Sequence, residues 1–98
     1  MNKETALVEA IALWCIVTAE EETDNCSYIV YHDKIEKHFG VSPEWLRIHE
    51  SEILFEIQQH SDIIADAQIG EEAIGKTQTH YFDLDIYGNY CDVDLDED

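Results

Sequence analysis

The sequence has few basic residues, one proline, four glycines and three cysteines. Only five of its 98 residues are Lys or Arg, against 23 Asp or Glu, and none of the five follows Lys76. The formal net charge of −18 repels nucleic acid and anionic membranes, so we expect a basic protein surface as partner and neither of these as a direct one. The lack of any CxxC or HxxxH spacing leaves no sequence signal for structural zinc.

The cysteine count argues against a disulfide framework. Cys15, Cys26 and Cys91 cannot all pair within one chain, so we expect reduced thiols in a cytoplasmic protein. The N-terminal segment carries acidic residues and lacks a small-residue cleavage site, so no secretory signal is expected. Its apolar run, residues 10–17, is too short to span a bilayer.

Length and composition predict a single acidic α+β domain over residues 1–98. A domain of this size buries a little over about 60% of its unfolded-chain surface, which supports a modest core. We expect no enzyme, cofactor or metal site, because no nucleophile motif is present. The nearest approach to a calcium loop would begin at Asp83, but it has Tyr87 at its fifth position and Asp94 at its twelfth.

The first third of the chain predicts a helix, an acidic loop and a strand. The helix, residues 3–20, has apolar residues nearly all round, so it is either central or packs its second face against another subunit; we expect central burial. Residues 20–25 are expected to form the loop, and the aromatic and β-branched run 27–31 the strand. The expected buried stripe of the helix is Leu7, Ala10, Ile11, Trp14 and Val17.

Two helices separated by Gly40 are predicted next. Asp33 is placed to cap the first, residues 34–39, and Gly40 suits the left-handed residue that follows a helix. The second starts at Ser42-Pro43, an N-cap hydroxyl followed by Pro at the first helical position, and runs to about His60. Its expected buried residues are Trp45, Leu46, Ile53, Leu54 and Ile57, with Ile48 or Phe55 on the flank.

The segment KIEKHFGVSPEWLRIHESEILFEI resembles a helix-turn-helix. With a helix and a strand before it and a hairpin after it, the chain has the element order of a winged-helix domain: helix-strand-helix-turn-helix, followed by an antiparallel β-hairpin or a three-stranded sheet. A DNA-reading helix needs Arg, Lys, Asn or Gln, but this one offers Glu44, Glu50, Glu52 and Glu56 against Arg47, which argues against direct DNA binding.

The C-terminal stretch HYFDLDIYGNYCDVDLDED predicts an acidic hairpin. Apolar and acidic residues alternate on both sides of Gly88-Asn89, a pair that suits a tight turn. Phe82, Leu84 and Ile86 are expected on the core face. Before this stretch, residues 62–69 are expected to form a third strand and residues 70–79 a polar loop. The opposite face of the hairpin carries the candidate partner-binding residues: Asp83, Asp85, Asp92, Asp94, Asp96, Tyr81, Tyr87 and Tyr90.

The charge density of such a hairpin suggests a function. Alternate residues on a strand are about 6.6 to 6.8 Å apart, so two paired rows give one carboxylate per roughly 3.4 Å, close to the phosphate spacing of one nucleic-acid strand. In size, charge and acidic face the chain resembles nucleic-acid-mimicking inhibitors, such as phage-encoded anti-CRISPR and anti-restriction proteins. The resemblance implies an inhibitor that occupies a basic, nucleic-acid-binding surface of a partner protein, through aspartates that bind Arg or Lys and tyrosines that act as anchors.

Three other interpretations remain open at this point. The same surface would suit an immunity protein or antitoxin that masks a basic nuclease toxin. A non-catalytic structural or regulatory subunit would instead bind through the helix-turn-helix and the first helix, which also offers a face for a homodimer. Finally, the acidic face would serve a purely structural purpose if it kept an edge hairpin from aggregating.

Overall fold

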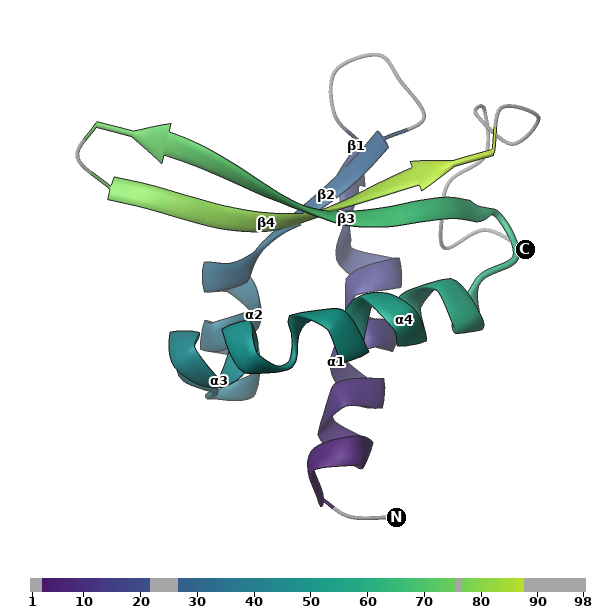
Figure 1. Ribbon diagram of the computed structural model, residues 1–98, viewed down its shortest axis with the longest axis horizontal. Coiled ribbons are helices and arrows are strands. Elements are labelled where there is room, and N and C mark those ends of the chain that lie inside the picture. The colour runs from purple at the N-terminus through teal and green to yellow at the C-terminus, as the bar shows by residue number, and fades with distance from the viewer. Residues whose placement is uncertain (1–2, 22–26, 76, 88–98) are drawn as a thin grey trace.

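The described part of the computed structural model, residues 3–21, 27–75 and 77–87, places four helices on one side of an antiparallel sheet (Figure 1). The α+β class expected from the sequence is therefore confirmed. None of these helices has the length and apolar character needed to cross a bilayer. The helices are α1 (Lys3–Thr18), α2 (His32–Phe39), α3 (Pro43–Ile48) and α4 (Glu50–His60). The strands are β1 (Glu20–Glu21), β2 (Ser27–Tyr31), β3 (Ile64–Ile74) and β4 (Thr77–Ile86).

The sheet has the order β1-β2-β4-β3, so β4 lies at its centre. β4 pairs with β2 from Tyr81 to Asp85 and with β3 along its whole length. Gly75, between β3 and β4, has a φ of 62°, a left-handed value that glycine adopts without strain. In the described residues, β4 thus forms its hairpin with β3, the strand that precedes it in the sequence. The expected second hairpin arm, beyond the turn at Gly88-Asn89, lies outside the described residues.

The segment between α4 and β4 contains one confirmed and one wrong prediction. A third strand was expected over 62–69, and β3 covers most of that range. The polar loop expected over 70–79 is wrong, because the hairpin continues through it in register as far as the pair Ile74 and Thr77. The sequence of this end of the hairpin is mostly polar and small, so its strands carry no apolar alternation from which they could be recognised.

The core lies between the sheet and the helices. Its strand residues alternate along β2 and β4, and the expected core face of Phe82, Leu84 and Ile86 is confirmed. Each large apolar side chain removed from water contributes about 1.5–3 kcal/mol, before the conformational entropy of ordering it is subtracted. The helical contribution comes from Val8, Ile11, Ala12, Cys15, Ile16, Ile35, Leu46, Ile53 and Ile57.

Helix α1 is buried on a different face from the one expected. Its buried residues are Val8, Ile11, Ala12, Cys15 and Ile16, so only Ile11 belongs to the predicted stripe. Central burial is also wrong, since Leu13 is 44% exposed and Val17 is 60% exposed. Because apolar residues surround this helix, the spacing rule is satisfied by several faces, and the sequence alone does not choose among them.

The helix-turn-helix segment largely follows its local signals. Gly40 is left-handed with a φ of 68°, and the Oγ of Ser42 accepts a hydrogen bond from the Trp45 amide at 3.0 Å, as an N-cap does. Asp33 is not the cap of α2, which begins one residue earlier with no side-chain cap. The single long helix expected here is divided at His49, whose φ of −100° and ψ of 7° leave the helical region.

The burial expected for this long helix is confirmed only in part. Leu46, Ile53 and Ile57 are fully buried, while Trp45 and Leu54 are partly buried and pack against the core. The two flanking residues named from the sequence both lie at the surface. Ile48 is 73% exposed and Phe55 is 60% exposed.

Candidate functional site

One face of the sheet points away from the helices, and no described helix covers it (Figure 1). We call it the outer sheet face. Strands β2, β3 and β4 contain no Lys or Arg, and the described basic residues Lys3, Lys34, Lys37 and Arg47 all belong to helices. The acidic residues of these strands are therefore not balanced by a basic residue on the same strands. From the strand register and the burial pattern, the outer sheet face consists of Ser27, Ile29, Tyr31, Asp66, Gln68, Gly70, Glu72, Tyr81, Asp83 and Asp85.

Two carboxylates on this face lie directly opposite each other and are held by neighbouring donors. Asp66 and Asp85 are paired in register across β3 and β4. The Oγ of Ser27 donates to Oδ1 of Asp85 at 2.8 Å, and Nε2 of Gln68 donates to Oδ2 of Asp66 at 2.9 Å and to Oδ2 of Asp85 at 3.4 Å. These donors offset the repulsion between like charges on paired strands, so both carboxylates are held in fixed positions.

The other end of the outer sheet face is aromatic. Tyr31 and Tyr81 face each other across β2 and β4 and form an edge-to-face pair with ring centroids 5.6 Å apart. The hydroxyl of Tyr31 donates to Oε2 of Glu72 at 2.8 Å, which links the aromatic pair to the acidic edge strand. Tyr81 lies across Gly70, where no side chain competes for the space.

Three of the eight predicted partner-binding residues come together on this face: Tyr81, Asp83 and Asp85 are all partly buried there. Tyr87 follows β4 and is 49% exposed, with its backbone N–H donating to the Ile63 carbonyl at 3.0 Å. The remaining four predicted residues, Tyr90, Asp92, Asp94 and Asp96, lie outside the described residues.

The sequence did not identify the contribution of β3 to this face. Asp66, Gln68 and Glu72 lie two residues apart or a multiple of two, which is the period of a strand. That spacing was a usable signal, but their placement beside Asp85 depends on the pairing of β3 with β4. The pairing also argues against the interpretation that the acidic residues only keep an edge hairpin from aggregating. Asp83 and Asp85 lie on β4, a central strand of the described sheet, so they do not protect an edge.

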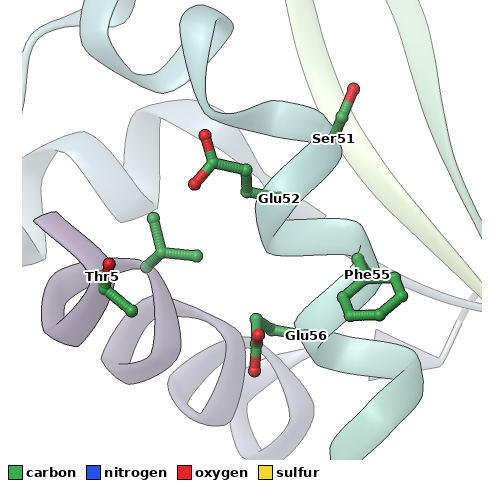
Figure 2. A pocket seen from close by; sticks show the side chains of 6 residues that line it. Thr5, Ser51, Glu52, Phe55 and Glu56 are labelled. Atoms are coloured by element: carbon green, nitrogen blue, oxygen red, sulfur yellow. The ribbon is translucent and has the colours of Figure 1, made fainter. Parts of the chain in front are cut away.

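A second candidate surface is a groove between α1 and α4 (Figure 2). It encloses about 300 Å³ and is lined by Thr5, Val8, Ser51, Glu52, Phe55 and Glu56. Glu52 and Glu56 project from α4 toward the gap, and the ring of Phe55 lies at its rim (Figure 2). The groove is thus apolar at its base and acidic along one side.

A third candidate, which the sequence did not reveal, is a cluster of His32, Glu50 and His80. Its members come from the junction of β2 and α2, the first residue of α4, and β4. One ligand atom from each lies within 4.8 Å of the others. Because no two of these residues are close in the sequence, only the fold brings them together.

The electrostatics of this cluster follow from its burial. His32 is 7% exposed, and its Nδ1 lies 3.7 Å from Oε2 of Glu50. Burial, followed by the positive charges of His80 and Arg47, lowers the pKa of His32 to about 4, so the ring is neutral at pH 7. Burial also raises the pKa of the Glu50 carboxyl.

No protein-family model, curated protein or solved structure matches the chain.

Proposed function

We propose that the chain is a cytoplasmic, non-catalytic inhibitor that binds a basic surface of another protein through its outer sheet face. The observation that carries this proposal is that four carboxylates share one face of the paired strands β2, β4 and β3, which contain no Lys or Arg. These are Asp66, Glu72, Asp83 and Asp85. A basic partner approaching this side meets carboxylates without a competing Lys or Arg from the same strands. The surface that suits such an array is one that binds nucleic acid.

The spacing of these carboxylates supports imitation of a polyanion. Neighbouring strands are about 4.8 Å apart and alternate residues about 6.7 Å apart, so carboxylates on adjacent strands form a closely spaced array of the kind that one nucleic-acid strand presents, with one charge per about 3.4 Å of its axis. Asp66 and Asp85 are already oriented by Gln68 and Ser27, so little side-chain freedom is lost when Arg or Lys donates to them. The net charge of −18 adds long-range attraction, which raises the association rate with a basic partner.

The order of elements supports a winged-helix arrangement as the scaffold of this surface. α2 and α3 form the helix-turn-helix around Gly40, and β2, β4 and β3 form a sheet in that spatial order. In this arrangement the β3–β4 hairpin, with its turn at Gly75, takes the position of the wing. A DNA-binding domain would present several basic residues there, whereas this hairpin has Glu71 and Glu72 on β3 and a single Lys, Lys76, between its strands.

The test is capture of basic proteins from a host lysate by the immobilised chain, with duplex DNA as competitor. We expect DNA to displace the captured protein and high salt to weaken capture. Changing Asp66→Asn and Asp85→Asn together should lower capture by about tenfold or more, because two charge-assisted contacts are lost. The matched control is Glu4→Gln with Glu44→Gln, which removes the same charge from exposed helical positions. Equal loss in both variants would contradict the proposal.

A nuclease toxin is one partner of the required chemistry, since its substrate-binding surface is basic. An immunity protein or antitoxin would use the same outer sheet face, and inhibition of the captured protein's nuclease activity would assign it to this class. Retention of the activity would assign the chain to inhibitors of non-nuclease DNA- or RNA-binding proteins.

A second candidate function is that of a structural subunit that pairs with another copy of itself through α1. The observation that favours it is an exposed apolar stripe along this helix: Ala6, Ala10, Leu13 and Val17. Light scattering on the purified chain tests it, with Leu13→Lys expected to convert a dimer to a monomer. Gln59→Lys, an exposed position near the end of α4, is the control. A wild-type chain that is monomeric across the concentration range would exclude this function.

A further inference from the structure

We propose that His32, Glu50 and His80 form a binding site for a divalent transition-metal ion, with Zn²⁺ as the best match. Two imidazoles and one carboxylate are a common set of protein ligands for zinc at an open site, where the fourth position is left to water or another small ligand. Mg²⁺ and Ca²⁺ prefer sites built from oxygen atoms alone, so the donor set selects against them.

The first support is an unsatisfied buried atom. His32 is 7% exposed, and its Nε2 is buried with no hydrogen-bond partner in the part of the chain that the structure describes. The other ring nitrogen, Nδ1, lies 3.7 Å from the nearest carboxylate oxygen of Glu50, beyond hydrogen-bonding distance. Leaving a buried polar atom without a partner costs about 1–3 kcal/mol, and a bound metal ion is one partner that a neutral imidazole nitrogen can take.

The second support is the geometry of the three groups. Their ligand atoms lie within 4.8 Å of one another, whereas the ligand atoms of a tetrahedral zinc ion are roughly 3.3 Å apart for bonds of about 2.0 Å. His32 is fixed by its edge-to-face contact with Phe82, at a centroid distance of 4.5 Å. His80 and Glu50 retain 24% and 14% of their side-chain exposure, so they are the groups that move inward on binding.

The surroundings suit an ion. Oε1 of Glu71 lies 3.7 Å from Nδ1 of His80, so a small movement of His80 toward the ion would let this carboxylate accept a hydrogen bond from the ring, as the outer carboxylate beside a ligating histidine commonly does. A cavity of about 440 Å³ adjoins both histidines and also contacts Arg47, so a bound ion would be accessible to small anions.

A second cluster in the chain serves as an internal comparison. Glu9, Glu56 and His60 also place one ligand atom each within 4.8 Å. However, His60 is exposed and its Nε2 already lies 3.3 Å from Oε2 of Glu56, one turn away on the same helix. This cluster lacks the buried, unpartnered nitrogen, and we expect no specific site there.

The experiment is calorimetric titration of the metal-free, full-length chain with Zn²⁺ in excess Mg²⁺. Magnesium occupies the acidic surface, so the remaining signal reports sites that contain nitrogen ligands. We expect one zinc ion per chain. His80→Gln and Glu50→Gln should each weaken binding by more than about 100-fold, because even substitutions outside the ligand set cost 10- to 100-fold. His60→Gln, the matched control, should leave the affinity within a few-fold of wild type.

Two further measurements make the result decisive. Co²⁺ used in place of Zn²⁺ should give visible absorption bands of low-coordinate cobalt in the wild type and in His60→Gln, and lose them in His80→Gln. Circular dichroism of each metal-free variant checks that the fold is retained, which is why the partly exposed His80 and Glu50 are changed before the buried His32. Zinc binding that is equal in wild type and His80→Gln, or several weak ions per chain, would overturn the assignment.

Discussion

The ring of Tyr81 lies over the backbone of Gly70, its direct partner across β3 and β4. A Cβ added at residue 70 would overlap the ring atoms Cζ and Cε2 and the hydroxyl of Tyr81. Gly70 has no positive φ, so its conformation is open to any residue and its role is to leave space. The ring of Tyr81 in turn covers the backbone of β3 at Gly70, where no side chain shields it from solvent.

This relationship predicts an effect that changes sign with the background. Gly70→Ala alone should lower the free energy of unfolding by about 1–2 kcal/mol, because the Tyr81 ring must leave its contact with Tyr31. In a Tyr81→Ala background the same change should be neutral or slightly stabilising, since alanine is a better strand residue than glycine. Urea unfolding of the four chains measures this coupling. Additive effects would mean that the two residues do not share this space.

A pH dependence is predicted for His32. Its pKa of about 4 in the folded chain is below the ordinary value of 6.5, so the unfolded chain binds more protons between these two pH values. The contribution is complete above pH 6.5 and is lost as the pH falls toward 4. Between pH 7 and 5 the loss is roughly 2 kcal/mol.

The measurement for His32 is the difference in unfolding free energy between the wild type and His32→Phe, both free of metal. Carboxyl groups away from His32, such as Glu36 with its raised pKa, contribute to both chains and largely cancel in the difference. On acidification, the unfolding free energy of the wild type should fall relative to that of His32→Phe. A difference that stays constant from pH 7 to 5 would show that His32 is protonated equally in the folded and unfolded chains.

Cys15 is predicted to be unreactive in the folded protein. It is fully buried in the core, and burial raises the pKa of its thiol to about 12, so almost no thiolate is present at pH 8. Alkylation should be at least about a thousand-fold slower than in denaturant, because it requires unfolding. A Cys26→Ser, Cys91→Ser variant makes Cys15 the only thiol. Rapid labelling under native conditions would place this side chain at the surface.

The N-cap of α3 gives a smaller, local prediction. Ser42→Ala removes the acceptor of the Trp45 amide and should lower stability by about 1 kcal/mol, whereas Ser42→Asp keeps an acceptor and should cost less. Ser51→Ala, at an exposed position in the first turn of α4, is the control and should be neutral. Thermal unfolding resolves these differences. Equal effects of Ser42→Ala and Ser51→Ala would show that the Ser42 side chain does not stabilise α3 as an N-cap.

The success of sequence reasoning on this chain depended on how local each signal was. Ser42 and Gly40 act within one turn of a helix, and the alternation of Phe82 and Leu84 acts within one strand, so these features were predicted correctly. The buried face of α1 was not, because its apolar residues fit more than one face and the choice is made by the elements packed against it. The division of the long helix at His49 has no evident cause in the residues around it.

The candidate site was predictable only where it lies within one strand. Asp83 and Asp85 could be placed on a common face from their spacing, but their neighbours Asp66 and Gln68 depend on a pairing that spans the hairpin. The proposed metal ligands are the extreme case, because their convergence requires the complete fold. A pattern search along the chain cannot find such a set.

The central place of β4 also has a consequence for synthesis on the ribosome. The hydroxyl of Ser27 on β2 donates a hydrogen bond to Asp85, 58 residues later in the chain, so β2 and β3 join only through β4, which is synthesised after both of them. Until that strand leaves the exit tunnel, β2 and β3 have no central partner and the helices lack the buried face of β4, with Phe82 and Leu84, to pack against. The nascent chain must therefore remain largely open, and within reach of chaperones, until translation has passed β4.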